Sequence, residues 1–475
     1  MHSPRCPFRP PFPEPVSEPR GLLRVLLKPA KLLRSRRCAL SPLIDRSYSM
    51  HMGEVGLLFR RLYVVNQPEL VRRVLIEEAE RFPKSTIIAD MLELLMGDSI
   101  FVSNGEVWKR QRRMMNPAFE QARIKIVFDR MREAVEALVV RLDAAAEGRP
   151  VDIDVEMTHV TADIIFRTIF SKPLEAHEAR LIFAALQRFQ ETAYTHGVSR
   201  YIGLPRFMSL LRYRRARRAA AEIRGVLDPL VRVRYDSFHR GEPDHHGDIL
   251  AALIAVKDPV DGSHFDFREL CEQVSMLFLA GHETSASALS WALYILSRQA
   301  DVQERLRREA ISVFDGRAPR FSDMKRLNLA RNVFRETLRL YPPVAFLPRD
   351  AAEAVTMRDK KIKPGAIITI SPWIIHRHRK LWADPDLFDP DRWDREDSIE
   401  SQRNAYLPFS LGPRVCLGAA FALQEGTLIL ALLAREFRFE PVEGHEPKPI
   451  GRLTVRSENG IRLKVARRAA AELAS

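Results

Sequence analysis

One short stretch near the carboxyl end of the chain, Phe409–Gly418, combines residue types that can hold a metal. It reads Phe-Ser-Leu-Gly-Pro-Arg-Val-Cys-Leu-Gly, so Cys416 lies between Gly412 and Gly418 and two residues after Arg414. Glycine lets a backbone approach a bound group closely because it has no Cβ. A thiolate is a good ligand for soft metals, and N–H groups at the start of the apolar segment that follows can soften its charge. The spacing therefore makes Cys416 a candidate metal ligand, and the alternative for a lone cysteine is an inert, small apolar residue of the core.

A second stretch with residue types that can do chemistry lies inside Phe267–Ser297. The apolar residues of this segment keep helical spacing for several turns. The segment is long enough to cross a bilayer, but the polar residues at its centre favour a long buried helix instead. Its middle reads Ala280-Gly281-His-Glu283-Thr284. Glycine in a helix interior is about 1 kcal/mol worse than alanine, and a buried glutamate is worse still unless it is used. The pattern predicts a functional interruption of this helix.

Two further pairs occur at helical spacing. Trp108 and Arg112 are four residues apart, and Glu336 and Arg339 are three apart, so each pair shares one face of its helix. Either pair alone is a weak signal, because an isolated ion pair of this kind contributes only about 0.2–0.5 kcal/mol.

Taken together, these stretches resemble the cytochrome P450 family. Residues 409–418 match every fixed position of its haem-binding loop, Phe-x-x-Gly-x-Arg-x-Cys-x-Gly, and residues 280–284 match its oxygen-binding groove, (Ala/Gly)-Gly-x-(Asp/Glu)-Thr. The Trp-x-x-x-Arg and Glu-x-x-Arg pairs occur in the same order as in the family. The resemblance extends over about residues 45–467 and carries at least four ordered motifs.

The resemblance implies a role for each matched residue. Cys416 becomes the axial thiolate of haem b, iron protoporphyrin IX, while Trp108, Arg112 and Arg349 meet the haem propionates. Thr284 with Glu283 becomes the catalytic pair that delivers protons to O2, the co-substrate. The remaining matched positions form two sets: those around the haem, Phe409, Gly412, Arg414, Gly418, Ala280 and Gly281, and a structural network before the cysteine loop, Glu336, Arg339 and Arg392, where Trp393 replaces the usual Phe.

The fold implied is mainly α, a triangular helical prism with a smaller β-rich side. A length of 475 residues suggests about three domains, yet no linker or repeat interrupts residues 50–465, so we expect one domain over 46–475. Residues 1–45 form a separate Pro/Arg-rich segment. Among the local elements, Ser103 predicts a capping box with Glu106, and Arg452–Val465 predicts a terminal hairpin.

The composition of the chain limits the classes of binding partner that we expect. The net charge is +14, and no nucleic-acid-binding motif accompanies it, so we expect no nucleic acid. Four cysteines without paired spacing indicate a reducing, cytoplasmic compartment. We expect no transmembrane anchor. The proline penalty at Pro29 favours a broken surface helix over Gly21–Arg37, and the alternative for this basic segment is peripheral contact with a membrane. The stripe Lys109, Arg110 and Arg113 is expected to help dock an acidic electron donor.

The leading interpretation is a haem-thiolate monooxygenase that hydroxylates or epoxidises a lipophilic substrate. Electrons would come from a separate ferredoxin or flavoprotein, because no dinucleotide fingerprint stands in a strand–helix context. An isomerase or dehydratase on the same fold and a haem gas sensor are the alternatives. The expected substrate walls are largely apolar: 87–95, 194–209, 278–284, 344–347 and 457–461.

Overall fold

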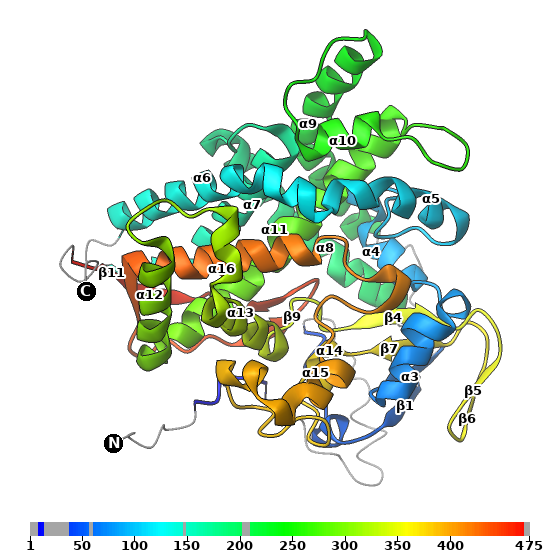
Figure 1. Cartoon of the computed structure of the whole chain (residues 1–475). Coiled ribbons are helices and arrows are strands. Elements are labelled where there is room, and N and C mark those ends of the chain that lie inside the picture. The colour runs from blue at the N-terminus through cyan, green and yellow to red at the C-terminus, as the bar shows by residue number, and fades with distance from the viewer. Residues whose placement is uncertain (1–7, 14–37, 57–59, 146–148, 202–209, 470–475) are drawn as a thin grey trace.

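The computed structural model shows a mostly helical molecule with small sheets on one side (Figure 1). The helix expected over Phe267–Ser297 is present as α11 with those bounds. The residues that the structure describes are 8–13, 38–56, 60–145, 149–201 and 210–469. The other principal helices are α3 (Pro68–Arg72), α4 (Thr86–Met96), α5 (Gly105–Met115), α6 (Gln121–Ala145), α7 (Ile153–Phe170), α8 (Ala176–Tyr201), α9 (Leu210–His239), α10 (Ile249–Ala255), α12 (Ala300–Phe314), α13 (Asn328–Leu340), α14 (Pro372–Ile375), α15 (Ile399–Ala405) and α16 (Ala419–Glu436).

Helix α11 runs through the interior of the molecule. It begins with a capping box, in which Asp266 accepts from the Glu269 N–H at 2.7 Å and Glu269 accepts from the Asp266 N–H at 2.9 Å. The predicted interruption is absent, because residues 267–297 form one continuous α-helix. Gly281 instead allows close packing: a Cβ on it would come within 3.0 Å of Ile165 on α7. The glycine therefore serves helix packing at this point of α11.

The largest sheet has four strands in the order β1-β2-β7-β4. Its β2–β7 pair is parallel, and the β1–β2 and β4–β7 pairs are antiparallel. The last three residues of β2 and all four residues of β7 are buried, so this part of the sheet lies inside the molecule. The strands of the molecule are β1 (Met52–Gly56), β2 (Arg61–Val65), β3 (Val151–Asp152), β4 (Leu347–Asp350), β5 (Val355–Met357), β6 (Lys360–Ile362), β7 (Ile367–Ile370), β8 (Phe437–Pro441), β9 (Pro449–Gly451), β10 (Val455–Ser457) and β11 (Arg462–Arg467).

Two local predictions are wrong. The turn at Asn459-Gly460 does not close a hairpin, because β10 pairs with β9 whereas β11 pairs with β8 and β3. Helix α5 is not capped by Ser103. Its N-cap is Asn104, and the Ser103 hydroxyl donates to Gln111 at 2.7 Å. In both cases a tertiary partner outcompetes the local motif.

Part of the amino-terminal segment lies against the body of the fold. Phe8 and Phe12 pack on the main core, the Phe12 ring lies edge-on to Tyr48, and the Phe388 N–H donates to the Phe8 carbonyl at 3.2 Å. The segment Gly21–Arg37, interpreted from sequence as a surface helix with membrane contact as the alternative, lies outside the described residues.

Candidate active site

The loop before α16 is fixed by a close backbone contact. Gly412 has φ +72°, and a Cβ there would lie 2.0 Å from the Leu75 carbonyl oxygen. Only glycine satisfies both conditions. The loop then turns so that the Cys416 N–H donates to the Phe409 carbonyl at 2.8 Å. Gly412 therefore allows the turn of the loop that positions Cys416.

The pair on α5 contacts the cysteine loop. Arg112 Nη1 donates to the Val415 carbonyl at 2.9 Å. The Arg414 guanidinium lies over the Trp108 ring, 4.2 Å from its centre, and also donates to the Ser103 carbonyl at 3.0 Å. The structure therefore brings the α5 pair and the loop together.

Lys84 and Arg349 extend this positive charge. Their backbones form an isolated β-bridge, which places the two residues side by side. Burial, together with repulsion from Arg349 and Arg414, holds the pKa of Lys84 well below its usual range. Desolvation lowers the pKa of Arg349 to about 10, and its side chain is only 5 % exposed. Burying cations this way is costly without an anion.

The Cys416 side chain is exposed, although most of its surroundings are protein. This desolvation raises the pKa of its thiol, while the Gly418 N–H, Arg112 and Lys84 act in the opposite direction. Desolvation outweighs these three contributions, so the pKa of the Cys416 thiol stays above its ordinary value.

Three residues in the middle of α11 are more exposed to solvent than the residues around them. Between Leu270 and Ser297 every residue is buried except Ala280, Gly281 and Thr284. These three occupy neighbouring turns of one face, and the Thr284 hydroxyl donates to the Ala280 carbonyl at 2.8 Å. The structure places all three where a bound group can reach them.

The Glu283 side chain is buried and contacts residues of the carboxyl-terminal part of the chain. Arg456 on β10 donates to it through Nε at 3.0 Å and Nη2 at 2.9 Å, and the Thr454 hydroxyl donates at 2.7 Å. Burial alone would raise the pKa of Glu283, but Arg456 outweighs it and brings the pKa to about 2. Arg456 also lies 3.7 Å from Asp154 of α7. Glu283 is therefore a fixed carboxylate in the observed arrangement.

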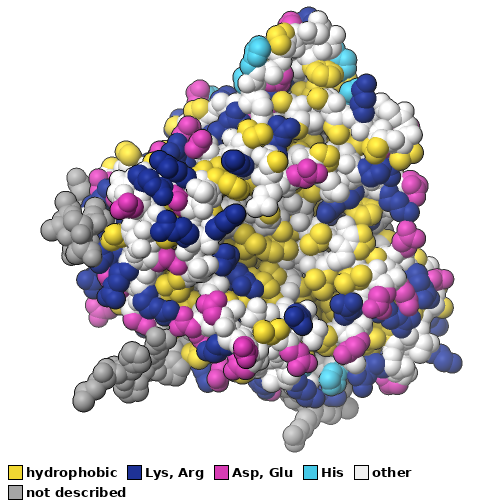
Figure 2. All heavy atoms as spheres, viewed as in Figure 1, with side chains coloured by type: hydrophobic (Ala, Val, Ile, Leu, Met, Phe, Trp, Pro, Cys, Tyr) yellow, Lys and Arg dark blue, Asp and Glu magenta, His cyan; other side chains and the backbone are white. Residues whose placement is uncertain are grey.

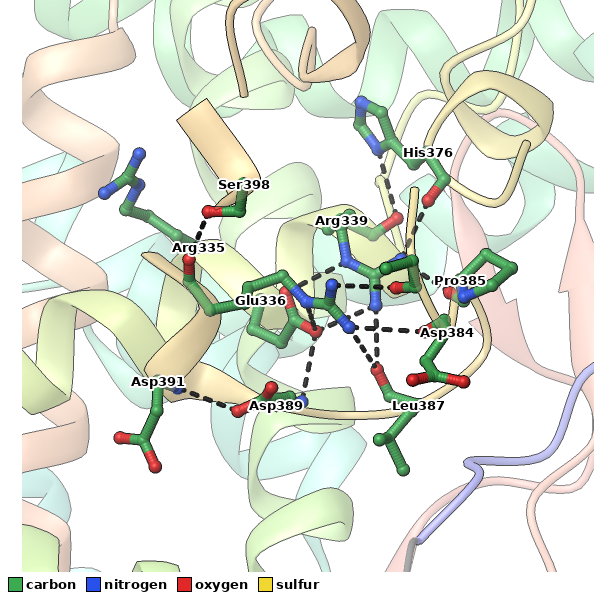
Figure 3. A network of polar contacts seen from close by, with 12 residues as sticks. Arg335, Glu336, Arg339, His376, Asp384, Pro385, Leu387, Asp389, Asp391 and Ser398 are labelled. Atoms are coloured by element: carbon green, nitrogen blue, oxygen red, sulfur yellow. Dashed lines mark hydrogen bonds and ion pairs between the residues drawn. The ribbon is translucent and has the colours of Figure 1, made fainter. Parts of the chain in front are cut away.

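A buried network surrounds Glu336 (Figure 3). Arg339 donates to its carboxylate at 2.9 and 2.8 Å, and Arg392 donates at 2.9 Å. The two guanidinium groups also donate to the carbonyls of residues 376, 383, 384, 385 and 387. Opposite charges and satisfied donors make this burial stable, and the two arginines lower the pKa of Glu336 against its desolvation.

His376 links that network to the cysteine loop. Its Nδ1 contacts the Arg339 carbonyl at 3.0 Å, and its Nε2 accepts from the Leu407 N–H at 2.9 Å. Burial and the nearby Arg339 lower the pKa of His376 to about 3, so the ring is neutral. Leu407 stands two residues before Phe409, so the network positions the chain that leads into Cys416.

The expected docking stripe on α5 is not free. Lys109 pairs with Glu80 and Glu106, Arg110 with Glu269 at 2.7 Å, and Arg113 with Asp258 at 2.8 Å. Glu106 lies on the same helix as Lys109, whereas Glu80, Asp258 and Glu269 come from other parts of the chain. These ion pairs lower the net charge of the stripe, and its role in docking an acidic electron donor stays a prediction.

Comparisons with known proteins identify the family. The family model "Cytochrome P450" matches residues 46–465. This chain belongs to the cytochrome P450 family. It is 34 % identical over 396 residues to "Cyclooctatin synthase" of Streptomyces melanosporofaciens, covering 83 % of this chain and 84 % of that protein. It is 32 % identical to "Cyclooctat-9-en-7-ol 5-monooxygenase" of the same organism, over 82 % and 83 % of the two chains.

A solved structure agrees with this placement. The heme domain of cytochrome P450DA superposes with a TM-score of 0.81 at 26 % identity, covering 98 % of this chain and 99 % of that one. The mainly helical P450 fold expected from the motifs is therefore confirmed. The chain is an oxidoreductase of the P450 monooxygenase class.

The residues present fit a haem. Its two propionates need cations, and Lys84, Arg112, Arg349 and Arg414 form no ion pair with any carboxylate in the described part of the chain. On the other side of the loop, a Cβ on Gly418 would meet no protein atom within 4 Å. An exposed thiol beside four unpaired cations suits an anionic macrocycle with a soft metal.

The motifs missed two contributors, Lys84 and Arg456. Lys84 follows a Phe-Pro pair and belongs to no recognised spacing. The one local signal for Lys84 is its position directly before Ser85, the residue that caps the N-terminus of α4. Arg456 carried no sequence signal, because only the pairing of β10 with β9 turns its side chain towards α11.

Proposed function

We propose that this cytochrome P450 holds haem b on Cys416 and transfers one oxygen atom of O2 to a lipophilic substrate, with electrons from a separate donor. The observation that carries this proposal is the exposed Cys416 thiol beside four cations that lack carboxylate partners. When bound, the haem supplies electron transfer and O2 activation. The protein supplies the thiolate, the propionate contacts and the shape of the substrate site.

Thr284 is proposed to hold the proton at the reacting centre. Its hydroxyl is partly exposed on α11 and can exchange its bond to the Ala280 carbonyl for one to a ligand or a water molecule. Glu283 is proposed as the neighbouring acid, but the Arg456 pair keeps it ionised. Proton passage by Glu283 therefore requires Arg456 to move away, for example towards Asp154.

The substrate is proposed to be apolar and terpenoid-like. Ile87, Met91 and Leu95 of α4 pack in one apolar cluster with Leu277 and Phe278 of α11. Such a wall binds hydrocarbon surface rather than charge. The names of the relatives agree, since they include a cyclooctat-9-en-7-ol monooxygenase and a pentalenene oxygenase. Of the expected wall 194–209, residues 202–209 lie outside the described part.

The electron donor is proposed to be a separate ferredoxin or flavoprotein that docks on the face crossed by α16, in the cytoplasm. Figure 2 shows hydrophobic side chains gathered near the middle of this face, with Lys and Arg side chains, interspersed with Asp and Glu, around them. Such a surface suits an acidic partner, and its charges act mainly on association rate. None of the helices within the described ranges is long and apolar enough to cross a bilayer.

Two measurements test the function. The haem-loaded protein, reduced and exposed to CO, should show a thiolate-type absorption spectrum that Cys416→Ser abolishes, because a hydroxyl cannot replace the anionic sulfur. A panel of lipophilic compounds should then shift the spin state of the haem, and the compounds that do so should gain oxygen only with O2, a donor and its reductase. Conversion of a substrate without O2 or reductant would instead indicate an isomerase or dehydratase. Turnover driven by NADPH alone would contradict the separate donor.

A further inference from the structure

A small cleft lies between α8 and the chain that forms β9 and β10. Its volume is about 170 Å³, and its lining combines one residue of α8, Gln190, with residues between positions 450 and 458. A site for a whole drug-sized ligand has about 300–1,000 Å³. This cleft can therefore receive only one end of a larger molecule, and the groups in its lining indicate what kind of end fits.

The side-chain amide of Gln190 is a buried donor without a partner. Gln190 follows Phe183 by seven residues on α8, so the two side chains lie on one face of the helix. The Phe183 ring centre lies 6.4 Å from that of His282 on α11, so this face of α8 points to α11. Gln190 Nε2 is buried there and has no hydrogen-bond partner among the described residues. Such a group is unfavourable unless a water molecule or a ligand accepts from it.

The formal charges around the cleft cancel. Arg452 and Glu458 both line it and are exposed, so one cation and one anion face the same space. Arg456 lines it as well, but its guanidinium is held by Glu283 at 2.9 and 3.0 Å. An anionic ligand would therefore meet no net positive charge. A neutral oxygen, in contrast, can accept from Gln190 and Arg452 without adding a charge to the cleft.

The cleft adjoins the proposed substrate site. Leu453 lines the cleft and packs against the apolar cluster that contains Met91 of α4 and Phe278 of α11. Thr454, also in its lining, donates to Glu283, the residue before Thr284. An apolar molecule that lies against the wall formed by α4 and α11 can thus extend one end past Leu453 into the cleft.

We propose that this cleft holds a neutral oxygen group, a hydroxyl or a carbonyl, of an otherwise apolar substrate. Gln190 Nε2 donates to that oxygen from the buried side, and Arg452 donates to it from the exposed side. The substrate class is then an oxygenated terpenoid-like molecule rather than a pure hydrocarbon, an inference that rests on the proposed function. An earlier hydroxylation or hydration must supply this substrate, because a hydrocarbon precursor carries no such oxygen.

The two donors set the expected selectivity of binding. One hydrogen bond changes affinity by about fivefold, and a buried donor that is left unpaired disfavours an analogue that lacks the oxygen. With Gln190 as the buried donor and Arg452 as the exposed one, an alcohol should bind about tenfold more tightly than the matching hydrocarbon.

The test measures dissociation constants of four compounds with one carbon skeleton for the haem-loaded chain, by the spin-state change of the haem and by equilibrium dialysis. β-Farnesene is the hydrocarbon, farnesol the alcohol, farnesal the aldehyde and farnesoic acid the carboxylate. Gln190→Leu removes the donor at similar size, and Gln190→Glu replaces it with an acceptor. The matched control is Gln187→Leu, which removes an exposed glutamine about one turn earlier on α8.

The proposal expects farnesol and farnesal to bind about tenfold more tightly than β-farnesene. Gln190→Leu should reduce this preference about fivefold without weakening β-farnesene. Gln190→Glu should weaken farnesal, whose oxygen can only accept, more than farnesol, whose hydroxyl can also donate. Gln187→Leu should leave all four dissociation constants within about twofold of the parent values.

Equal affinity for β-farnesene and farnesol, or no binding of either, would overturn the proposal, and so would equal effects of Gln190→Leu and Gln187→Leu. Tightest binding of farnesoic acid that Arg452→Gln abolishes would also overturn it and assign the cleft to a carboxylate. The thiolate-type spectrum of the same reduced, CO-bound samples separates these results from a failure of the proposed function, because only the latter removes that spectrum.

Discussion

Arg456 on β10 and Glu283 on α11 form a two-point ion pair, with nitrogen–oxygen distances of 3.0 and 2.9 Å. The pair joins the carboxyl-terminal strands to the helix that carries Thr284. It also fixes the charge of Glu283, whose pKa is about 2. Arg456 therefore controls both the stability of this junction and the availability of a proton beside Thr284.

Arg456→Gln should destabilise the protein by about 3–5 kcal/mol, because it leaves a buried carboxylate without its partner. The free energy of unfolding in urea measures this loss. The control is Arg462→Gln, which changes an exposed arginine of β11. Adding Glu283→Gln to the variant should recover much of the loss.

The pH dependence gives a second check on this pair. The folded-state pKa of Glu283 lies below its ordinary value of 4.5. Its contribution is therefore complete above pH 4.5 and is lost as the pH falls towards 2. Arg456→Gln should remove this acid-dependent loss, and a variant that kept it would contradict the assignment to Glu283.

Thr284→Ala should keep haem content and substrate binding but divert reductant to hydrogen peroxide. The alanine removes the hydroxyl that holds a proton at the exposed part of α11. Product formed per reductant consumed should fall several-fold, with peroxide rising in proportion. Thr284→Ser, which keeps the hydroxyl, should stay near the parent value. An unchanged ratio in Thr284→Ala would place proton delivery elsewhere.

Glu425 on α16 should bind its proton at neutral pH. It is 2 % exposed and accepts from the Ser285 hydroxyl, and burial raises its pKa to about 8. Since the unfolded chain ionises near 4.5, folding stability falls as pH rises from about 4.5 to 8. Glu425→Gln lacks this dependence, so its stability relative to the parent should improve by up to about 4 kcal/mol over that range. A constant difference would mean that Glu425 ionises normally.

Gly412→Ala should prevent correct closure of the cysteine loop. The added Cβ would lie 2.0 Å from the Leu75 carbonyl oxygen, and the backbone has φ +72°. Gly444→Ala is the control, because Gly444 has the same φ but no neighbour within 4 Å. The control should lose only about 1–2 kcal/mol, whereas Gly412→Ala should also lose haem on purification. Equal behaviour of the two variants would remove the steric argument.

The sequence by itself determined the parts that depend on local spacing. Glycine, arginine and cysteine spacing in Phe409–Gly418 identified the loop, because tight turns and close approach restrict which residues fit. Helical periodicity located α11 at its observed bounds, since an apolar stripe must face the core along its whole length. The family followed from the order of these motifs.

The tertiary structure alone decided which charges are paired. Lys109, Arg110 and Arg113 look like a basic stripe in sequence, yet Arg110 and Arg113 find their acidic partners, Glu269 and Asp258, on elements distant in the chain. Glu283 likewise looked like a proton carrier until β10 supplied Arg456. Electrostatic energy depends on separation in space and on burial, and neither is encoded in the spacing of residues along the chain. For that reason the sequence named the groups of this site, and only the fold assigned their charge states.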